Sequence, residues 1–124
     1  MLSVSDFPDG WQRTDEVNDN FDAVFQNEDE TIVVFVLIAI HDTVEAAKED
    51  YETSLNSFRD PQEMDFADEA FWDTQNDEAA YCIFQDSNVE GQTASMRLSG
   101  GEPIPDQSRA QKYARTMHEN WQEL

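Results

Sequence analysis

TIVVFVLIAI, residues Thr31–Ile40, contains nine consecutive apolar residues, and β-branched side chains dominate it. An apolar run without alternation and rich in β-branched residues is typical of a strand buried on both faces. A helix needs about 20 apolar residues to cross a bilayer, so this run is too short to span a membrane. We therefore expect it to be the central strand of a sheet that is covered on both sides.

The segments around this strand predict the rest of an α+β fold. On its N-terminal side, short strands are expected at residues 11–17 and 21–26, the second half-buried with one face in solvent. On its C-terminal side, Asp42 and Glu45 have the spacing of a capping box, and a helix is expected near residues 42–59, before Pro61. Val44, Ala47, Tyr51, Leu55 and Phe58 form its apolar stripe.

The second half of the chain predicts more strands and a final helix. Residues 62–75 are expected to be a loop with one short strand near Ala70–Asp73, followed by a buried strand at 79–85. Residues 86–91 read as a hairpin turn, and the next strand buries one face through Ala94, Met96 and Leu98. After a break at 99–105, Asp106 caps a helix near 106–122. Its apolar stripe comprises Ala110, Tyr113, Ala114, Met117, Trp121 and Leu124.

The 124 residues are expected to form one domain, residues 1–124, which is large enough to bury a core without disulfides. Cys82 is the only cysteine, so a disulfide framework and a multi-cysteine metal site are excluded, and it reads as a small buried hydrophobe. The N-terminal residues have no basic segment followed by an apolar one, so we expect a cytoplasmic protein. No cofactor is expected.

The charge balance is the most unusual property of the chain. Asp and Glu number 28 against 7 Lys and Arg, a net charge of −21. Residues 1–62 carry 15 acids and 3 bases, and residues 63–124 carry 13 acids and 4 bases. The apolar content argues against disorder, and a nucleic-acid mimic should concentrate its charge. The even distribution favours a surface adapted to molar salt, and so few bases exclude nucleic-acid binding.

Three sequence features together resemble the PsbP and Mog1-like group. They are the order of elements with its closing amphipathic helix, the opening Phe7-Pro8-Asp9-Gly10-Trp11, and the segment Ala67-Asp68-Glu69-Ala70-Phe71-Trp72. The resemblance implies a central antiparallel sheet with helices on both faces, an α/β/α sandwich. It also implies an assembly or regulatory binding protein, since the group includes photosystem accessory subunits and a Ran GTPase-binding factor. It carries over no catalytic residue.

Two groups of residues are candidates for function. His41, Asp42 and Glu45 could form an acid/base or metal corner, although helix capping explains the same residues. On the final helix, Arg109, Lys112, Arg115 and His118 are expected on the arc opposite the apolar stripe. They could dock an acidic protein or a second copy of the chain, or pair with acidic neighbours within the chain.

The sequence therefore predicts a non-catalytic protein-binding or accessory domain that contacts its partner, or itself, through the last helix. Two alternatives stay open: a nucleic-acid mimic that inhibits a DNA-binding protein, and a small enzyme that uses the His41–Asp42 corner. No membrane association is expected.

Overall fold

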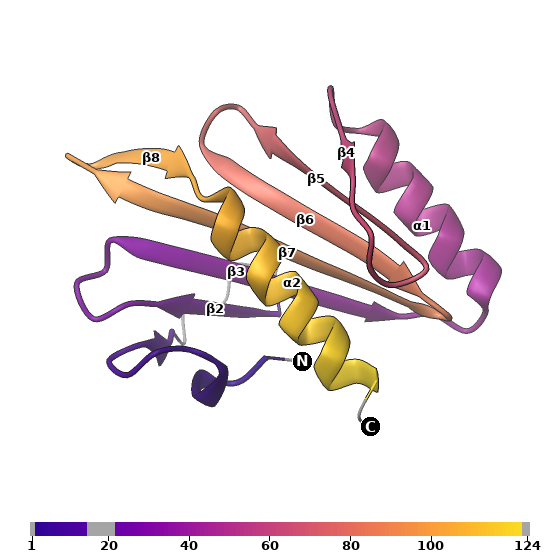
Figure 1. The fold of residues 1–124 in the computed structure, drawn as a ribbon, viewed down its shortest axis with the longest axis horizontal. Helices are drawn as coiled ribbons and strands as arrows, with labels where there is room; N and C mark the ends of the chain where they lie inside the picture. The colour runs from indigo at the N-terminus through magenta and orange to yellow at the C-terminus, as the bar shows by residue number, and fades with distance from the viewer. Residues whose placement is uncertain (1, 15–21, 123–124) are drawn as a thin grey trace.

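The computed structural model describes residues 2–14 and 22–122. Within them, eight strands form one antiparallel sheet and two α-helices pack against it (Figure 1). A short 3-10 helix, η1 (Val4–Asp6), precedes the sheet. The strands are β1 (Gln12–Arg13), β2 (Ala23–Gln26), β3 (Ile32–Ile40), β4 (Gln62–Glu63), β5 (Glu69–Gln75), β6 (Ala79–Asp86), β7 (Val89–Ser99) and β8 (Glu102–Pro105). The helices are α1 (Val44–Asn56) and α2 (Gln107–Gln122).

The strand order is β1-β2-β3-β7-β6-β5-β4, and β8 pairs with the end of β7. β2 and β3 form an antiparallel hairpin, with Phe25 opposite Val34. The expectation that residues 31–40 form the central strand is only partly right. β3 is an interior strand, but β7 lies in the middle of the order, and Ile40 at the end of β3 is 67% exposed.

The central strand β7 is rich in polar residues. Hydrogen bonds allow two of them to be buried. The Thr93 hydroxyl donates to the carbonyl of Ala110 at 2.6 Å, and the Ser95 hydroxyl donates to the carbonyl of Val33 at 3.0 Å. Buried polar groups are tolerated when they are paired in this way. The sequence pattern identified the apolar neighbour β3 and missed the position of β7.

The two helices cover opposite faces of the sheet, so the α/β/α arrangement is confirmed. Successive residues of a strand point to opposite faces. In β6, Cys82 and Phe84 pack into the large core beneath α2, whereas Ile83 packs with Tyr51 of α1. Figure 1 shows α2 crossing the front of the sheet. On the other face, α1 contacts β6 and β7.

The close packing of α2 depends on a glycine in β7. A Cβ atom on Gly91 would lie 2.4 Å from the Phe84 ring and 3.0 Å from the Met117 Cε atom. Real Cβ atoms do not approach a ring this closely, so any larger residue at position 91 would push Phe84 or α2 away from the sheet.

Several predicted boundaries are wrong. The side chain of Thr43, not of Asp42, caps α1, since its oxygen accepts from the Ala46 amide at 3.1 Å, and the helix ends at Asn56. The hairpin turn is shorter than residues 86–91 because β7 already begins at Val89. β2 is buried on both faces, with Val24 and Phe25 both covered.

Other expected loops contain strands, and some expected elements extend beyond the residues that the structure describes. The predicted loop at 62–75 contains β4 and the seven-residue β5, and the predicted break at 99–105 contains β8. Of the strand expected at 11–17, only residues 12–13 form β1, and residues 15–17 lie outside the described ranges. Phe21 and Leu124 also lie outside them.

Candidate functional site

His41 lies at the junction between β3 and α1, where it is tied to the β6–β7 turn. Its amide donates to the carbonyl of Asn88 at 2.8 Å, and the Asn88 side chain donates to the carbonyl of His41 at 2.9 Å. These two bonds hold the start of α1 against the hairpin. Both bonds use backbone atoms of His41, so they fix the position of this residue independently of its side chain.

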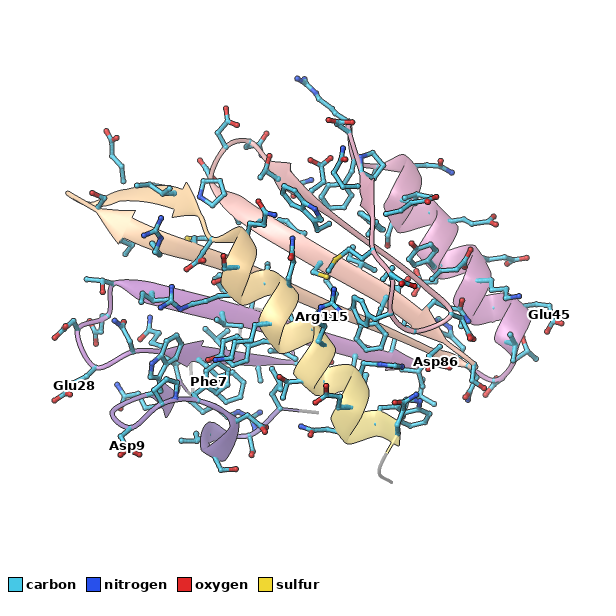
Figure 2. All side chains as sticks on the ribbon, in the orientation of Figure 1. Phe7, Asp9, Glu28, Glu45, Asp86 and Arg115 are labelled. Carbon is cyan, nitrogen blue, oxygen red and sulfur yellow. The ribbon has the colours of Figure 1, made fainter. Side chains whose placement is uncertain are left out.

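The imidazole of His41 contacts Asp50, a residue that the sequence did not single out. His41 Nε2 lies 3.1 Å from Asp50 Oδ2, whereas Asp42 and Glu45 are exposed. Figure 2 shows Glu45 at the outer edge of the molecule, pointing into solvent. The predicted corner of His41, Asp42 and Glu45 is thus not assembled. Among residues 2–14 and 22–122, no three His, Cys, Asp or Glu side chains are grouped as a metal site would require.

A buried carboxyl group completes the contact between α1 and the sheet. Glu90 of β7 is 2% exposed, and its side chain is hydrogen-bonded to that of Asp50. Burial, together with the neighbouring Asp50, raises the pKa of Glu90 to about 8. The neutral, protonated form of Glu90 is therefore favoured, since an ionised carboxylate is disfavoured in a buried site beside another carboxylate.

Two buried oxygens near this contact have no hydrogen-bond partner among the described residues. They are Oε2 of Glu90 and Oε1 of Gln85, and these two residues are opposite each other on β7 and β6. The Gln85 amide nitrogen is occupied, because it donates to the carbonyl of Ser87 at 2.8 Å. Sequence analysis missed this polar region because Glu90 lay in a predicted turn, and only the strand register brings it under α1.

The second candidate group begins at the N-terminal end of α2. Arg109 Nη1 lies 2.6 Å from Asp106 Oδ2, and Arg97 of β7 approaches the same carboxylate at 3.8 Å. Asp106 also accepts from the Arg109 amide at 3.4 Å, as expected for a helix cap. Arg109 is therefore partly engaged within the domain.

Lys112 and Arg115 are exposed and contact aromatic rings instead of carboxylates. The Lys112 Nζ atom lies 5.4 Å from the centroid of the Tyr113 ring, and the Arg115 guanidinium lies 4.9 Å from that of Phe66. Among the described residues, neither has a carboxylate within 4.0 Å. Figure 2 labels Arg115 near the middle of α2. The two side chains are one helical turn apart and form a small cationic surface.

His118 does not share this surface, contrary to expectation. It is 8% exposed, its ring packs edge-on against Phe66 and Phe84, and its Nε2 atom lies 2.6 Å from Asp86 Oδ2. Since α-helical residues advance by about 100°, His118 lies about 40° from Ala114 and about 60° from Arg115, at the border of the buried stripe. It anchors α2 to the end of β6, where Figure 2 labels Asp86.

Two further features have a structural explanation. A hollow of about 440 Å³ at the C-terminal end of α1 is lined by Arg59, Asp60, Asp73 and Asp77, among others. Both oxygens of the buried Asp73 carboxylate already accept backbone amides, from Asp60 and Thr74. Burial raises the pKa of Cys82 to about 12, so this residue is a thiol rather than a reactive thiolate.

Comparison with known protein families, with characterised proteins and with solved structures finds no match to this chain. No helix in the described part of the chain combines the length and apolar character needed to cross a membrane.

Proposed function

We propose that the protein is a non-catalytic binding domain that docks an acidic partner protein through the outer surface of α2. Arg109, Lys112 and Arg115 form this docking surface. The observation that carries the proposal is the state of Lys112 and Arg115, which are exposed and have no carboxylate within 4.0 Å in the described residues. Acidic residues outnumber basic ones 28 to 7, so two cations without a carboxylate partner are unusual in this chain. Both are available to an acidic surface of another molecule.

The aromatic contacts make these cations suitable for binding. A cation held over a ring gains about 0.5–1 kcal/mol at an exposed site, which limits the conformations of the long side chain. Less side-chain entropy is then lost when a partner binds. Arg109 contributes less, because Asp106 already shares its charge.

The acidic surface itself supports adaptation to molar salt. Carboxylates project from opposite ends of the molecule: Figure 2 labels Asp9 and Glu28 near each other at one end and Glu45 at the other. A nucleic-acid mimic would need one continuous row of carboxylates that imitates the phosphates of DNA. These positions do not favour such a row. At 1 M salt the screening length is about 3 Å, so a partner would be held by direct contacts and not by long-range attraction. A salt-rich cytoplasm is the environment that we propose.

The remaining alternatives receive less support. The small-enzyme hypothesis depended on His41, Asp42 and Glu45, of which His41 pairs with Asp50 and the other two point into solvent. The resemblance to the PsbP and Mog1-like group stays a prediction, and the binding role proposed for this chain agrees with what that resemblance implies.

The test is affinity capture in molar KCl followed by binding measurements with the purified partner. We expect Arg109→Gln/Lys112→Gln/Arg115→Gln to weaken the Kd of an acidic partner at least tenfold. The matched control, Arg13→Gln/Lys48→Gln/Arg59→Gln, changes the net charge equally and should leave the Kd within twofold. Equal weakening by both variants, or by neither, would contradict the proposal.

A second copy of the chain is the partner that must be distinguished in this test. Analytical ultracentrifugation of the wild-type protein in molar KCl gives the oligomeric state. A dimer that the α2 variant dissociates would replace the acidic partner with self-association through the same surface. A monomer leaves the docking surface for a different protein.

A further inference from the structure

The face of β7 that α1 covers carries a carboxyl group at a position where apolar packing would be expected. Glu90 is opposite Gln85 of β6 and Ala39 of β3, and its side chain is 2% exposed. Asp50, on α1, reaches it with a hydrogen bond between the two carboxyl groups. The pair therefore connects the helix directly to the centre of the sheet.

A hydrogen bond between two carboxyl groups requires a proton on one of them. Two ionised carboxylates in contact repel each other, and the repulsion is strongest where water is excluded. Glu90 is the buried member, whereas the Asp50 side chain is 42% exposed and also contacts His41. The shared proton belongs on Glu90, where ionisation would cost most.

Few buried apolar side chains hold this part of α1. The buried residues of the helix are Ala47 and Tyr51, and the apolar cluster beneath it consists of Tyr51, Phe71 and Ile83, with Leu55 and Phe58 at its margin. Asp50 lies between the two buried residues in sequence. The carboxyl pair therefore joins the His41–Asn88 hydrogen bonds in fastening α1 to the sheet.

We propose that Glu90 and Asp50 form a proton-dependent latch that fastens α1 to the sheet, and that loss of the shared proton releases the helix while α2 stays in place. The inference is independent of the docking surface on α2.

The groups around the pair do not supply a replacement for the proton. Glu69 of β5 and Glu63 of β4 lie near Tyr51, and Gln85 of β6 is neutral. Burial, followed by these two carboxylates, raises the pKa of the Tyr51 hydroxyl above its ordinary value, so Tyr51 stays neutral. No Lys or Arg contacts the pair in the described residues. His41 contacts Asp50, with its Nε2 atom 3.1 Å from Asp50 Oδ2.

The direction of the pH effect follows from proton binding. Glu90 holds its proton up to about pH 8 when α1 is closed, whereas an exposed glutamate releases it near pH 4.3. The closed state therefore binds more protons between these values, and its stability falls as the pH rises. The equilibrium constant for opening should rise about tenfold per pH unit from pH 5 to pH 8 and level off above it.

Hydrogen exchange of the full chain in molar KCl measures this constant, after correction for the intrinsic pH dependence of amide exchange. In the wild-type protein we expect the opening constant to rise with pH for the amides of α1 and to change little for those of α2. Glu90→Gln keeps the shape of the side chain and removes the titration, so its α1 amides should vary less than twofold across the same range.

Two further variants keep the test decisive. Glu69→Gln removes an exposed carboxylate from the same cross-strand row and should retain the wild-type slope. If Glu90→Gln does not fold, Asp50→Asn should make the rise level off at a lower pH than in the wild-type protein, because burial of Glu90 remains but the neighbouring carboxylate that also raises its pKa is removed. A wild-type slope shared equally by α1 and α2, the same slope kept in the α1 amides of Glu90→Gln, or an unchanged levelling pH in Asp50→Asn would overturn the proposal.

Discussion

The two helices of this protein are fastened to the sheet by different chemistry. Five residues of α2 are buried: Ala110, Tyr113, Ala114, Met117 and His118. They belong to or adjoin a core that includes Leu2 and Phe7 and runs from β2 to β6. In α1 only Ala47 and Tyr51 are buried, and a carboxyl pair takes the place of further apolar contacts. We infer that α2 shares the stability of the whole domain and that α1 can open separately.

The difference follows from how each helix meets the sheet. The aromatic rings of Phe7, Phe25 and Tyr113 stack beneath α2 with centroid separations of 4.4 and 4.2 Å from Phe7. Beneath α1, Tyr51 and Phe58 pack edge-on against Phe71 at 5.6 and 5.3 Å. Helix amphipathicity alone does not reveal this contrast, because both helices carry an apolar stripe. The area that each stripe buries decides which helix belongs to the cooperative core.

The largest effect is expected from truncating a side chain beneath α2. Phe84 is fully buried between α2 and the sheet, so Phe84→Ala should lower the free energy of unfolding by about 3–5 kcal/mol. Urea denaturation in molar KCl measures the change without altering the ionic strength.

The matched control for this experiment lies under the other helix. Phe58 is half-buried at the margin of the α1 cluster, and Phe58→Ala should cost less than Phe84→Ala. An equal or larger loss for Phe58→Ala would contradict the contrast between the two helices.

A smaller effect, confined to α1, is expected at its N-cap. Thr43→Ala removes the oxygen that accepts from the Ala46 amide, and such caps contribute about 1 kcal/mol. Hydrogen exchange should show the loss in the amides of α1, with those of α2 unchanged.

Asp42→Ala is the control, because the sequence predicted Asp42 as the cap and the structure gives that role to Thr43. In molar KCl, where salt screens its interaction with the helix dipole, Asp42→Ala should have little effect. A larger effect of Asp42→Ala than of Thr43→Ala would show that the cap is wrongly assigned.

The fold class could be predicted because its signals are local. Helical periodicity located both helices, and the apolar runs located β3 and β6. The two-residue β4 and the proline-containing β8 could not be found in this way, since Pro103 and Pro105 are breakers whose pairing with β7 depends on tertiary contacts. The central place of β7 also depends on strand order, which no local pattern encodes.

The candidate sites show the same division. Arg109, Lys112 and Arg115 follow from helical spacing, and the structure leaves Lys112 and Arg115 exposed. The contact of Asp50 with Glu90 joins residues 40 positions apart, and that of His118 with Asp86 joins residues 32 apart. Such long-range pairs arise from the packing of helix on sheet, so the sequence indicated neither.

The most direct test of the contrast between the helices is native-state hydrogen exchange of the wild-type protein at increasing urea, at pH 7 and in molar KCl. We predict that the amides of α1 exchange through an opening of lower free energy than global unfolding, with a weak dependence on urea. The most protected amides of α2 should instead exchange at the global free energy. If the amides of both helices exchange at the same free energy and with the same urea dependence, the domain opens as one unit, and the separate release of α1 is contradicted.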